Sequence, residues 1–249
     1  MIMALDSVYR DFGPENAEKA ADLLRAKVEE KGFDANKKID GVILGSGLGA
    51  FAERTMEMDK ADDVSGPVRL PFADVFKELS IDADVHALPG HAKALVVNEI
   101  PGSSALVMAQ AGREHLYEGV HPFRATFWLR VMQALGVRSV IGSNASGIVT
   151  PGLLTPKQDL MLVLGDMDRT GVSPFEGPND NRFGPRFPHR AFRYPLGFAD
   201  VVRESAKGFG IDLKEGIYFR NHGPEYETAE QVYEMRARLR GILSEALLQ

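Results

Sequence analysis

The chain has 249 residues, a net charge of -6 and a pI of about 5.6, and it contains no cysteine. The lack of cysteine excludes disulfides, thiolate zinc sites and cysteine nucleophiles, and the acidic balance gives no global attraction to nucleic acid or to an anionic membrane surface. No apolar run approaches the roughly 20 residues of a membrane-spanning helix, and the first residues lack the apolar core of a signal peptide. We therefore expect a soluble, cytoplasmic protein that binds neither nucleic acid nor membrane.

Helix and strand patterns alternate in the first half of the chain. Pro14 opens a helical stretch whose small and apolar residues share one stripe, and Gly32 stands where the helix should end. Residues 59–80 are polar and poorly periodic, which predicts a surface excursion. Short apolar runs predict buried strands within 40–51, 94–100 and 104–111.

The alternation continues in the second half. A helix is expected at 123–136, with one apolar face and an end at Gly136, and a long loop without periodicity at 171–195. The remaining strands are predicted at 138–147, 159–167 and 216–221, and the remaining helices at 197–209 and from about 228. There is no internal repeat and no linker, so residues 1–249 are expected to form a single α/β domain with a parallel or mixed sheet.

The stretch "GREHLYEG" (112–119) follows the predicted strand 104–111 and carries Arg113, His115 and Tyr117 at alternate positions. In an extended segment, alternate side chains project to the same face, so a guanidinium, an imidazole and a phenol would lie together. This pattern predicts a binding site. A solvated edge strand with an incidental histidine is the alternative.

A second candidate is the glycine-rich turn "GSGLG" (45–49) after the first strand. Glycines allow close backbone approach to an anion, and the Ser46 hydroxyl adds a donor. The third glycine of a dinucleotide fingerprint is absent, so a single phosphate fits better, although such a turn also serves merely to connect a strand to a helix. His91 lies on a Pro-Gly turn, and Glu227 precedes the last helix, where it could instead complement the helix dipole.

Six motifs together resemble the trimeric purine nucleoside phosphorylases, a family that includes the methylthioadenosine phosphorylases. They occur in the family's order and at similar spacings over residues 10–235. The motifs are "GVILGSGLG", "LPGHAKAL", "GREHLYEGVHP", "SNASG", "FEGPNDNRFGPRFP" and "HGPEYETAE". The resemblance implies a central mixed β-sheet flanked by helices, and a homotrimer.

The resemblance also implies a role for individual residues. Phosphate ligands are implied at Ser46, His91, Arg113, His115 and the backbone of Ala145. Ribose contacts are implied at Tyr117 and Phe183, the latter contributed to the neighbouring subunit, and base contacts at Tyr226 and Glu227. His91 and Glu227 are the implied catalytic side chains. No metal and no organic cofactor are implied, because inorganic phosphate is the co-substrate.

The family reaction is phosphorolysis, in which a purine nucleoside and phosphate give free base and ribose 1-phosphate. The residues agree with this chemistry, because breaking the glycosidic bond builds positive charge on the sugar and negative charge on the purine. Phosphate held by Arg113 and His115 would stabilise the sugar, and Glu227 would hold the base. A glutamate in "GPEYET" is typical of the enzymes that act on 6-oxopurine nucleosides.

The end of the chain departs from the family pattern. Family members continue beyond the helix that begins near Thr228, with further ribose, phosphate and base ligands, whereas this chain ends at "RARLRGILSEALLQ" on a helical period. The chain is therefore interpreted as a C-terminally shortened member. Two functional classes follow: a working purine nucleoside phosphorylase, or a catalytically impaired relative that binds phosphate or nucleoside or serves as a structural subunit.

Overall fold

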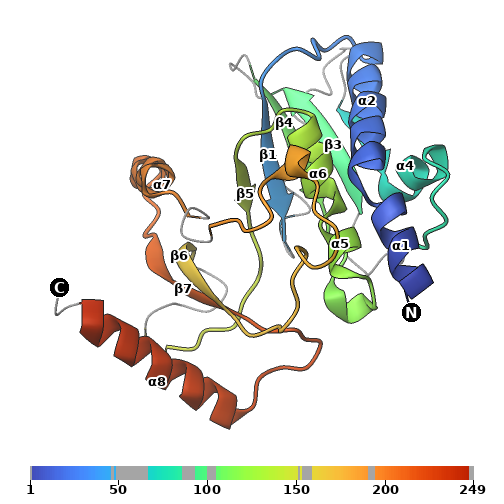
Figure 1. Cartoon of the computed structure of the whole chain (residues 1–249). Helices are drawn as coiled ribbons and strands as arrows, with labels where there is room; N and C mark the ends of the chain where they lie inside the picture. The colour runs from blue at the N-terminus through green and yellow to red at the C-terminus, as the bar shows by residue number, and fades with distance from the viewer. Residues whose placement is uncertain are drawn as a thin grey trace. The chain divides into compact units, whose positions relative to one another are not determined.

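The structure is a computed structural model, which describes residues 2–45, 48, 67–85, 93–99, 105–150, 152, 159–189 and 194–246. The chain divides into two compact units (Figure 1). Unit 1 comprises Met1–Ala145 and Ser173–Arg186, and unit 2 comprises Ser146–Val172 and Phe187–Gln249. Each unit has its own β-sheet.

The sheet of unit 1 has five strands in the order β2-β3-β4-β1-β5. Strand β1 (Ile39–Leu44) pairs in parallel with β4 (Leu106–Ala111) on one side and with β5 (Val140–Gly142) on the other. Strand β3 (Ala94–Glu99) runs antiparallel to β4 and to β2 (Val68–Pro71). The carboxyl ends of β4, β1 and β5 therefore meet at one edge of the sheet, which is where ligands bind in parallel α/β sheets.

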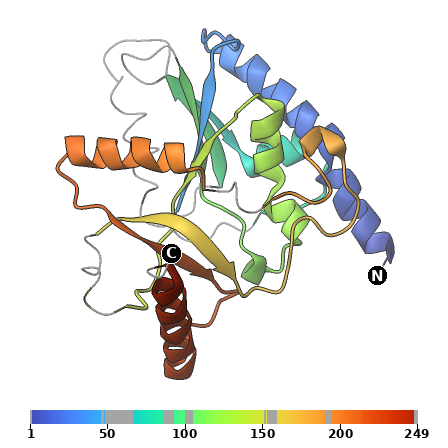
Figure 2. The ribbon, with the colours of Figure 1, turned by 60° about the vertical axis from the view of Figure 1, so that its left-hand side comes forward.

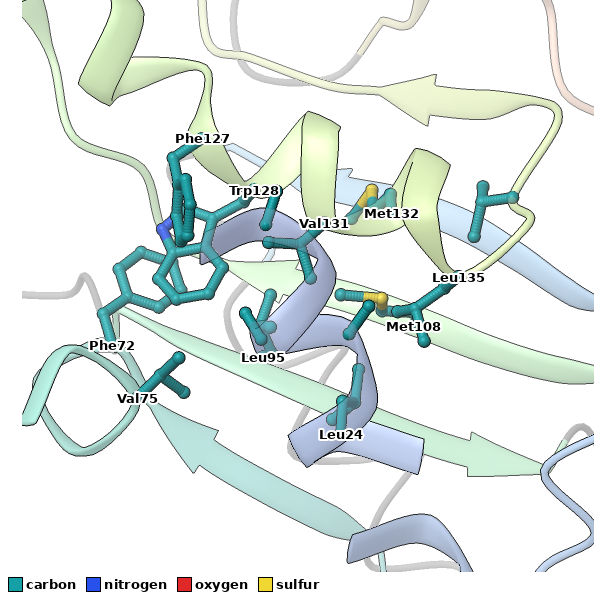
Figure 3. Packing of buried hydrophobic residues seen from close by; sticks show 14 of the residues in the cluster. Leu24, Phe72, Val75, Leu95, Met108, Phe127, Trp128, Val131, Met132 and Leu135 are labelled. Atoms are coloured by element: carbon teal, nitrogen blue, oxygen red, sulfur yellow. The ribbon is translucent and has the colours of Figure 1, made fainter. Parts of the chain in front are cut away.

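Helices cover one face of this sheet and form the main core with it. They are α1 (Ile2–Asp11), α2 (Pro14–Glu30), α4 (Phe72–Glu78), α5 (Pro122–Ala125) and α6 (Phe127–Ala134). Figure 3 shows how Leu24 of α2 and Val131 of α6 point toward Met108 of β4. The ring of Phe72 stacks on the indole of Trp128, with centroids 4.2 Å apart. Burial of such aromatic and aliphatic side chains is the main stabilising contribution to the unit.

The sequence patterns locate most of these elements. The apolar stripe of α2 is buried as expected, and Gly32 and Gly136 both follow their helices in the left-handed conformation, with φ of +81° and +88°. The predicted strands at 94–100 and 104–111 are confirmed as β3 and β4. Left-handed residues at helix ends favour glycine, because it has no Cβ to clash with the backbone.

The expected surface excursion at 59–80 is wrong from residue 68 onward. Here β2 is followed by α4, whose Phe72, Val75 and Phe76 are buried in the core. Polar residues before Val68 dilute the apolar period and conceal a helix of only seven residues. The helix expected at 123–136 is divided into α5 and α6 at Thr126, and α1 was not foreseen.

Unit 2 contains a parallel pair of strands, β6 (Met161–Asp168) and β7 (Lys214–Arg220), with a register irregularity between Val163 and Gly165. Figure 2 shows the two strands side by side. Helix α7 (Leu196–Gly208) contacts β6, and helix α8 (Ala229–Ala246) follows β7. The predicted strands and helices at 159–167, 197–209, 216–221 and beyond 228 are thus confirmed.

The predicted class, α/β with a mixed central sheet and packed helices, is confirmed by this architecture. Within the part of the chain that the structure describes, no helix combines the length and the apolar character needed to cross a membrane.

Candidate active site

The loops after β1 and β5 are joined by a tight backbone contact. The backbone N–H of Gly45 donates to Ser143 Oγ (3.1 Å), and the backbone N–H of Ser143 donates to the carbonyl of Ile43 (2.9 Å). A Cβ placed on Gly45 would lie 2.4 Å from the Ser143 carbonyl oxygen, so only glycine fits. This contact brings Gly45 beside the loop that carries Ala145, which is exposed. Both loops start at the carboxyl edge of the sheet.

A buried ion pair anchors the segment that follows β4. The Glu114 carboxylate, nearly fully buried, accepts from Arg124, whose Nη2 also donates to the carbonyl of Asp84 (2.6 Å). Glu114 lies between Arg113 and His115, so this anchor fixes the backbone that presents both residues. Breaking such a buried pair costs about 3–5 kcal/mol. The pair explains how a loop can position its side chains accurately.

His115 and Tyr117 lie in contact, and the charge of Arg113 acts on Tyr117. The rings of His115 and Tyr117 stack, with centroids 4.7 Å apart and planes 13° apart. Burial and the nearby Glu118 raise the pKa of Tyr117, while the positive charge of Arg113 opposes that increase. The three polar groups thus share one neighbourhood next to the carboxyl end of β4.

The extended backbone from which the sequence analysis grouped these residues ends at His115. Residues Leu116–Glu118 form a 3₁₀ turn, η1, which ends at Gly119 with φ of +81°. His115 itself is extended and caps this turn, and the Glu118 side chain folds back to the His115 backbone N–H. Reciprocal capping satisfies donors that would otherwise be unpaired, so it favours the turn over a continued strand.

Glu118 is the centre of a buried network that also contains Lys93. Its Oε1 lies 2.8 Å from the backbone N and 2.8 Å from Nδ1 of His115, and its Oε2 accepts from Lys93 Nζ. Burial alone would raise the pKa of Glu118, but the hydrogen bonds from Lys93 and His115 outweigh it, so the pKa lies below its ordinary value. Glu118 is therefore a charged residue that fixes the orientation of the His115 ring.

The predicted base-binding residues lie in unit 2, on the link between β7 and α8. Tyr226 is 95% exposed, and the exposed carboxylate of Glu227 accepts from Nδ2 of Asn221. The cap of α8 is made by other residues, since Thr228 and Gln231 exchange hydrogen bonds of 2.8 Å and 3.3 Å. Glu227 is consequently oriented by Asn221 and is not needed to cap the helix.

Phe183, the predicted ribose contact for a neighbouring subunit, lies in the 3₁₀ turn η2 (Asn181–Phe183) of unit 1. It is half-buried and packs against the helix-side core. The adjacent Arg182 donates to Glu18 (2.9 Å), Glu15 (3.0 Å) and Asp180 (2.7 Å), which ties this segment to α2. The other predicted site residues, Ser46 and His91, lie outside the described residues.

Sequence reasoning missed the residues that hold the predicted site residues in place, among them Glu118, Lys93 and Asn221. The three-residue spacing from His115 to Glu118, followed by Gly119, is a capping signal that indicates Glu118. Nothing in the sequence pairs Lys93 with Glu118, which lies 25 positions further along the chain. Among the described residues, no three His, Asp or Glu side chains are grouped so that they could hold a metal ion.

Comparison with known proteins gives one consistent family. The sequence pattern of the phosphorylase superfamily matches residues 71–245. Purine nucleoside phosphorylase 1 of Geobacillus stearothermophilus is 34% identical over 219 residues, which cover 88% of this chain and 71% of that protein. Its namesake from Bacillus subtilis is also 34% identical, over 222 residues that cover 89% of this chain and 73% of that protein.

A solved structure agrees with these sequence matches. Isoform 2 of purine nucleoside phosphorylase from Schistosoma mansoni, in complex with cytosine and ribose-1-phosphate, superposes with a TM-score of 0.72 at 27% identity. The superposition covers 89% of this chain and 71% of that chain. The chain therefore belongs to the purine nucleoside phosphorylase family, within the phosphorylase superfamily.

Proposed function

We propose that the chain catalyses the reversible phosphorolysis of purine nucleosides, with 6-oxopurine nucleosides as substrates and inorganic phosphate as co-substrate. The family assignment supports the reaction class. The ribose-1-phosphate in the Schistosoma mansoni structure supports a sugar phosphate as the product. The proposed reaction uses neither a metal nor an organic cofactor.

The observation that carries this proposal is the arrangement of Arg113 and His115 at the carboxyl edge of the sheet. Arginine binds phosphate through a planar fork of donors, and a histidine with one nitrogen engaged presents the other to a ligand. Because Nδ1 of His115 faces Glu118, Nε2 is the nitrogen assigned to phosphate. Ser46 and the backbone at Ala145 are assigned as further phosphate donors from the adjoining loops.

In the proposed reaction, a phosphate oxygen forms a bond to the anomeric carbon of the ribose while the bond from that carbon to the purine nitrogen breaks. The bonding pair leaves with the purine, and the proton that phosphate gives up on becoming an ester is the one that the departing purine gains. Phosphate beneath the sugar stabilises the positive charge that develops there and then captures it. His91 is assigned to the phosphate and ribose side of this step.

The base is assigned to Tyr226 and Glu227. An aromatic ring offers a stacking surface for the purine, and a carboxylate accepts hydrogen bonds from ring N–H groups. A 6-oxopurine carries an N–H at the position next to its carbonyl, whereas a 6-aminopurine has an acceptor there. The carboxylate held by Asn221 therefore favours inosine and guanosine over adenosine.

We assign Tyr117 to the ribose, together with Phe183 from the neighbouring subunit of a homotrimer. Arg182 supports this assignment, because its contacts with Glu15 and Glu18 hold the segment that carries Phe183. Sedimentation analysis of the purified chain tests the trimer. Mixing an Arg113→Ala chain with a Phe183→Ala chain should restore one intact site in each mixed trimer. Activity that exceeds the sum of the two separate samples supports the assignment.

The main experiment measures inosine phosphorolysis at saturating phosphate, with hypoxanthine as the readout. Arg113→Ala should lower kcat/KM for phosphate about 100-fold, since two charge-assisted hydrogen bonds are lost. Arg10→Ala, an exposed arginine on α1, is the matched control and should leave turnover unchanged. Adenosine in place of inosine tests the base preference.

The outcomes separate the two functional classes. Turnover that disappears only in Arg113→Ala supports the phosphorylase. No turnover of any purine nucleoside, together with a phosphate-dependent rise in Tm, would indicate a catalytically impaired relative that keeps its anion site. Neither turnover nor a shift in Tm would contradict phosphate binding altogether.

A further inference from the structure

Lys93 reaches the proposed phosphate site from a separate part of the chain. It directly precedes β3, its side chain is only 2% exposed, and its ammonium contacts Oε2 of Glu118, whose side chain is 9% exposed. Lysine is almost never fully buried unless it is paired. The contact is thus a specific buried ion pair, in which Glu118 joins Lys93 to His115.

The backbone at Lys93 is also unusual. Its φ of +41° places it in the left-handed region, which residues with a side chain rarely adopt. Its carbonyl accepts from the backbone N–H of Phe72 (2.9 Å), at the start of α4. Such a conformation persists only where the surroundings hold it, and these conformations cluster at functional sites. The buried ion pair and the contact with α4 supply that support.

Glu118 on its own would create an electrostatic conflict. Its two hydrogen bonds to His115 orient the imidazole, but its negative charge opposes the attraction of Arg113 for an anion. An ammonium that contacts the far oxygen of the same carboxylate removes this conflict. The orientation of His115 is then retained, and the positive charge near Arg113 is not cancelled.

We propose that Lys93 is a positioning residue of the phosphate site, which neutralises Glu118 so that this carboxylate can hold the His115 ring without weakening anion binding. The identity of the anion as phosphate rests on the proposed function. Lys93 acts through Glu118 and is not assigned a contact with substrate.

The charge of Lys93 predicts a specific effect on phosphate binding. The described charged and polar groups near His115 include Glu118, Tyr117 and Arg113, and Lys93 contacts the far oxygen of Glu118. Without Lys93, the negative charge of Glu118 is no longer neutralised and opposes the bound anion. Removal of the Glu118 charge in the same chain should therefore restore part of the lost affinity.

The test compares Lys93→Met with wild type by calorimetric titration with inorganic phosphate. Lys93→Met should raise the Kd about 10-fold, because one positive charge beside the anion site is lost. Lys93→Met/Glu118→Gln removes the charges of the pair together and should bring the Kd closer to that of wild type than Lys93→Met alone. Lys37→Met, which removes the lysine of the Lys37–Glu99 pair, is the matched control and should leave the Kd unchanged.

Two further measurements keep the test decisive. Lys93→Gly removes the ammonium but suits the left-handed backbone, so it reports the loss of charge if Lys93→Met folds poorly. NMR spectra of labelled histidine, assigned with His115→Gln, report the surroundings of the His115 ring without any need for turnover or phosphate. Both Lys93 variants should shift the ring nitrogen signals of His115, and Lys37→Met should not.

The outcomes distinguish this inference from the proposed function. Phosphate binding that Lys93→Met leaves unchanged, or a loss of affinity that Glu118→Gln does not reverse in the double variant, would overturn the role of Lys93 and leave the phosphorylase proposal intact. If wild type does not bind phosphate, the proposed function fails, and the NMR spectra alone decide: shifted ring signals of His115 in the Lys93 variants support the relation between Lys93 and His115, and unchanged signals overturn it.

Discussion

Oε1 of Glu118 lies 2.8 Å from the backbone nitrogen of His115 and 2.8 Å from its ring Nδ1, so one oxygen fixes both the main chain and the side chain of that residue. A histidine held in two places loses little conformational freedom when it binds a ligand. The other oxygen of Glu118 contacts Lys93. The site is therefore preorganised by groups that the proposed mechanism never brings into contact with substrate.

Replacement of Glu118 by Gln is expected to lower the free energy of unfolding by about 3 kcal/mol at neutral pH, because the buried Lys93 ammonium loses its partner. The pKa of Glu118 is lowered in the folded protein, so its contribution is complete above the ordinary value of 4.5 and is lost as the pH falls through the lowered value. Urea unfolding at neutral and acidic pH measures the difference, which should shrink in acid.

Glu99→Gln is the matched control for this prediction. It breaks the more exposed Lys37–Glu99 pair and should cost only about 0–1 kcal/mol. A Glu118→Gln penalty that is equally large in acid would mean that the packing of the side chain, and not its charge, stabilises the loop.

Gly45→Ala is expected to destabilise unit 1 by about 1–3 kcal/mol and to abolish the effect of phosphate on Tm. The added Cβ would meet backbone atoms of Ser143 and Asn144 at 2.4 Å and 2.6 Å, so the two loops must separate. Thermal unfolding with and without phosphate measures both effects. Gly142→Ala, where a Cβ meets nothing within 4 Å, should behave like wild type. Equal behaviour of the two variants would remove the argument for close loop contact.

Phe72→Ala is expected to lower the free energy of unfolding by about 3–5 kcal/mol, because it empties a fully buried position against Trp128. Denaturant unfolding monitored by fluorescence of the single tryptophan measures the change. Phe209→Ala, at a position 83% exposed, should stay within about 0.5 kcal/mol. A small effect at Phe72 would show that α4 contributes little to the core.

Glu227→Gln is expected to reduce kcat/KM for inosine about 100-fold and to leave the Kd of phosphate unchanged, since only the base loses a charge-assisted hydrogen bond. Steady-state kinetics and calorimetry measure the two quantities. The neighbouring, exposed Glu225→Gln serves as the control and should alter neither. If Glu227→Gln impairs kcat/KM for inosine and the Kd of phosphate to the same extent, the residue maintains the structure and does not recognise the base.

The sequence predicts those parts of the fold that depend on local patterns. The apolar stripe of α2, the buried runs of β3 and β4, and the glycines at 32 and 136 each identify their element without knowledge of a partner. A short element next to polar residues gives no such local signal, which is why the sequence analysis does not predict α4. Local patterns favour long elements, because each additional turn repeats the same signal.

The same distinction applies to the candidate site, where residues in a local pattern can be predicted and residues that depend on a distant partner cannot. Arg113, His115 and Tyr117 are visible because they follow a strand at regular spacing, and the structure brings them together. The sequence does not indicate a role for Lys93, since its partner Glu118 becomes a neighbour only when β3 pairs with β4. The sequence does not indicate Asn221 either, because a single amide side chain forms no pattern. Its hydrogen bond to Glu227 exists only in the folded chain.

The path of the chain between the two units has a practical consequence for dissection of the protein. Unit 1 takes residues 173–186 from within the sequence of unit 2, so the chain passes from one unit to the other three times. A fragment that stops at Ala145 would lack the η2 segment and its Arg182 anchor, and α2 would keep Glu15 and Glu18 without their cation. Expression of either unit alone thus calls for a rejoined or circularly permuted gene, and simple truncation at one boundary would produce two incomplete halves.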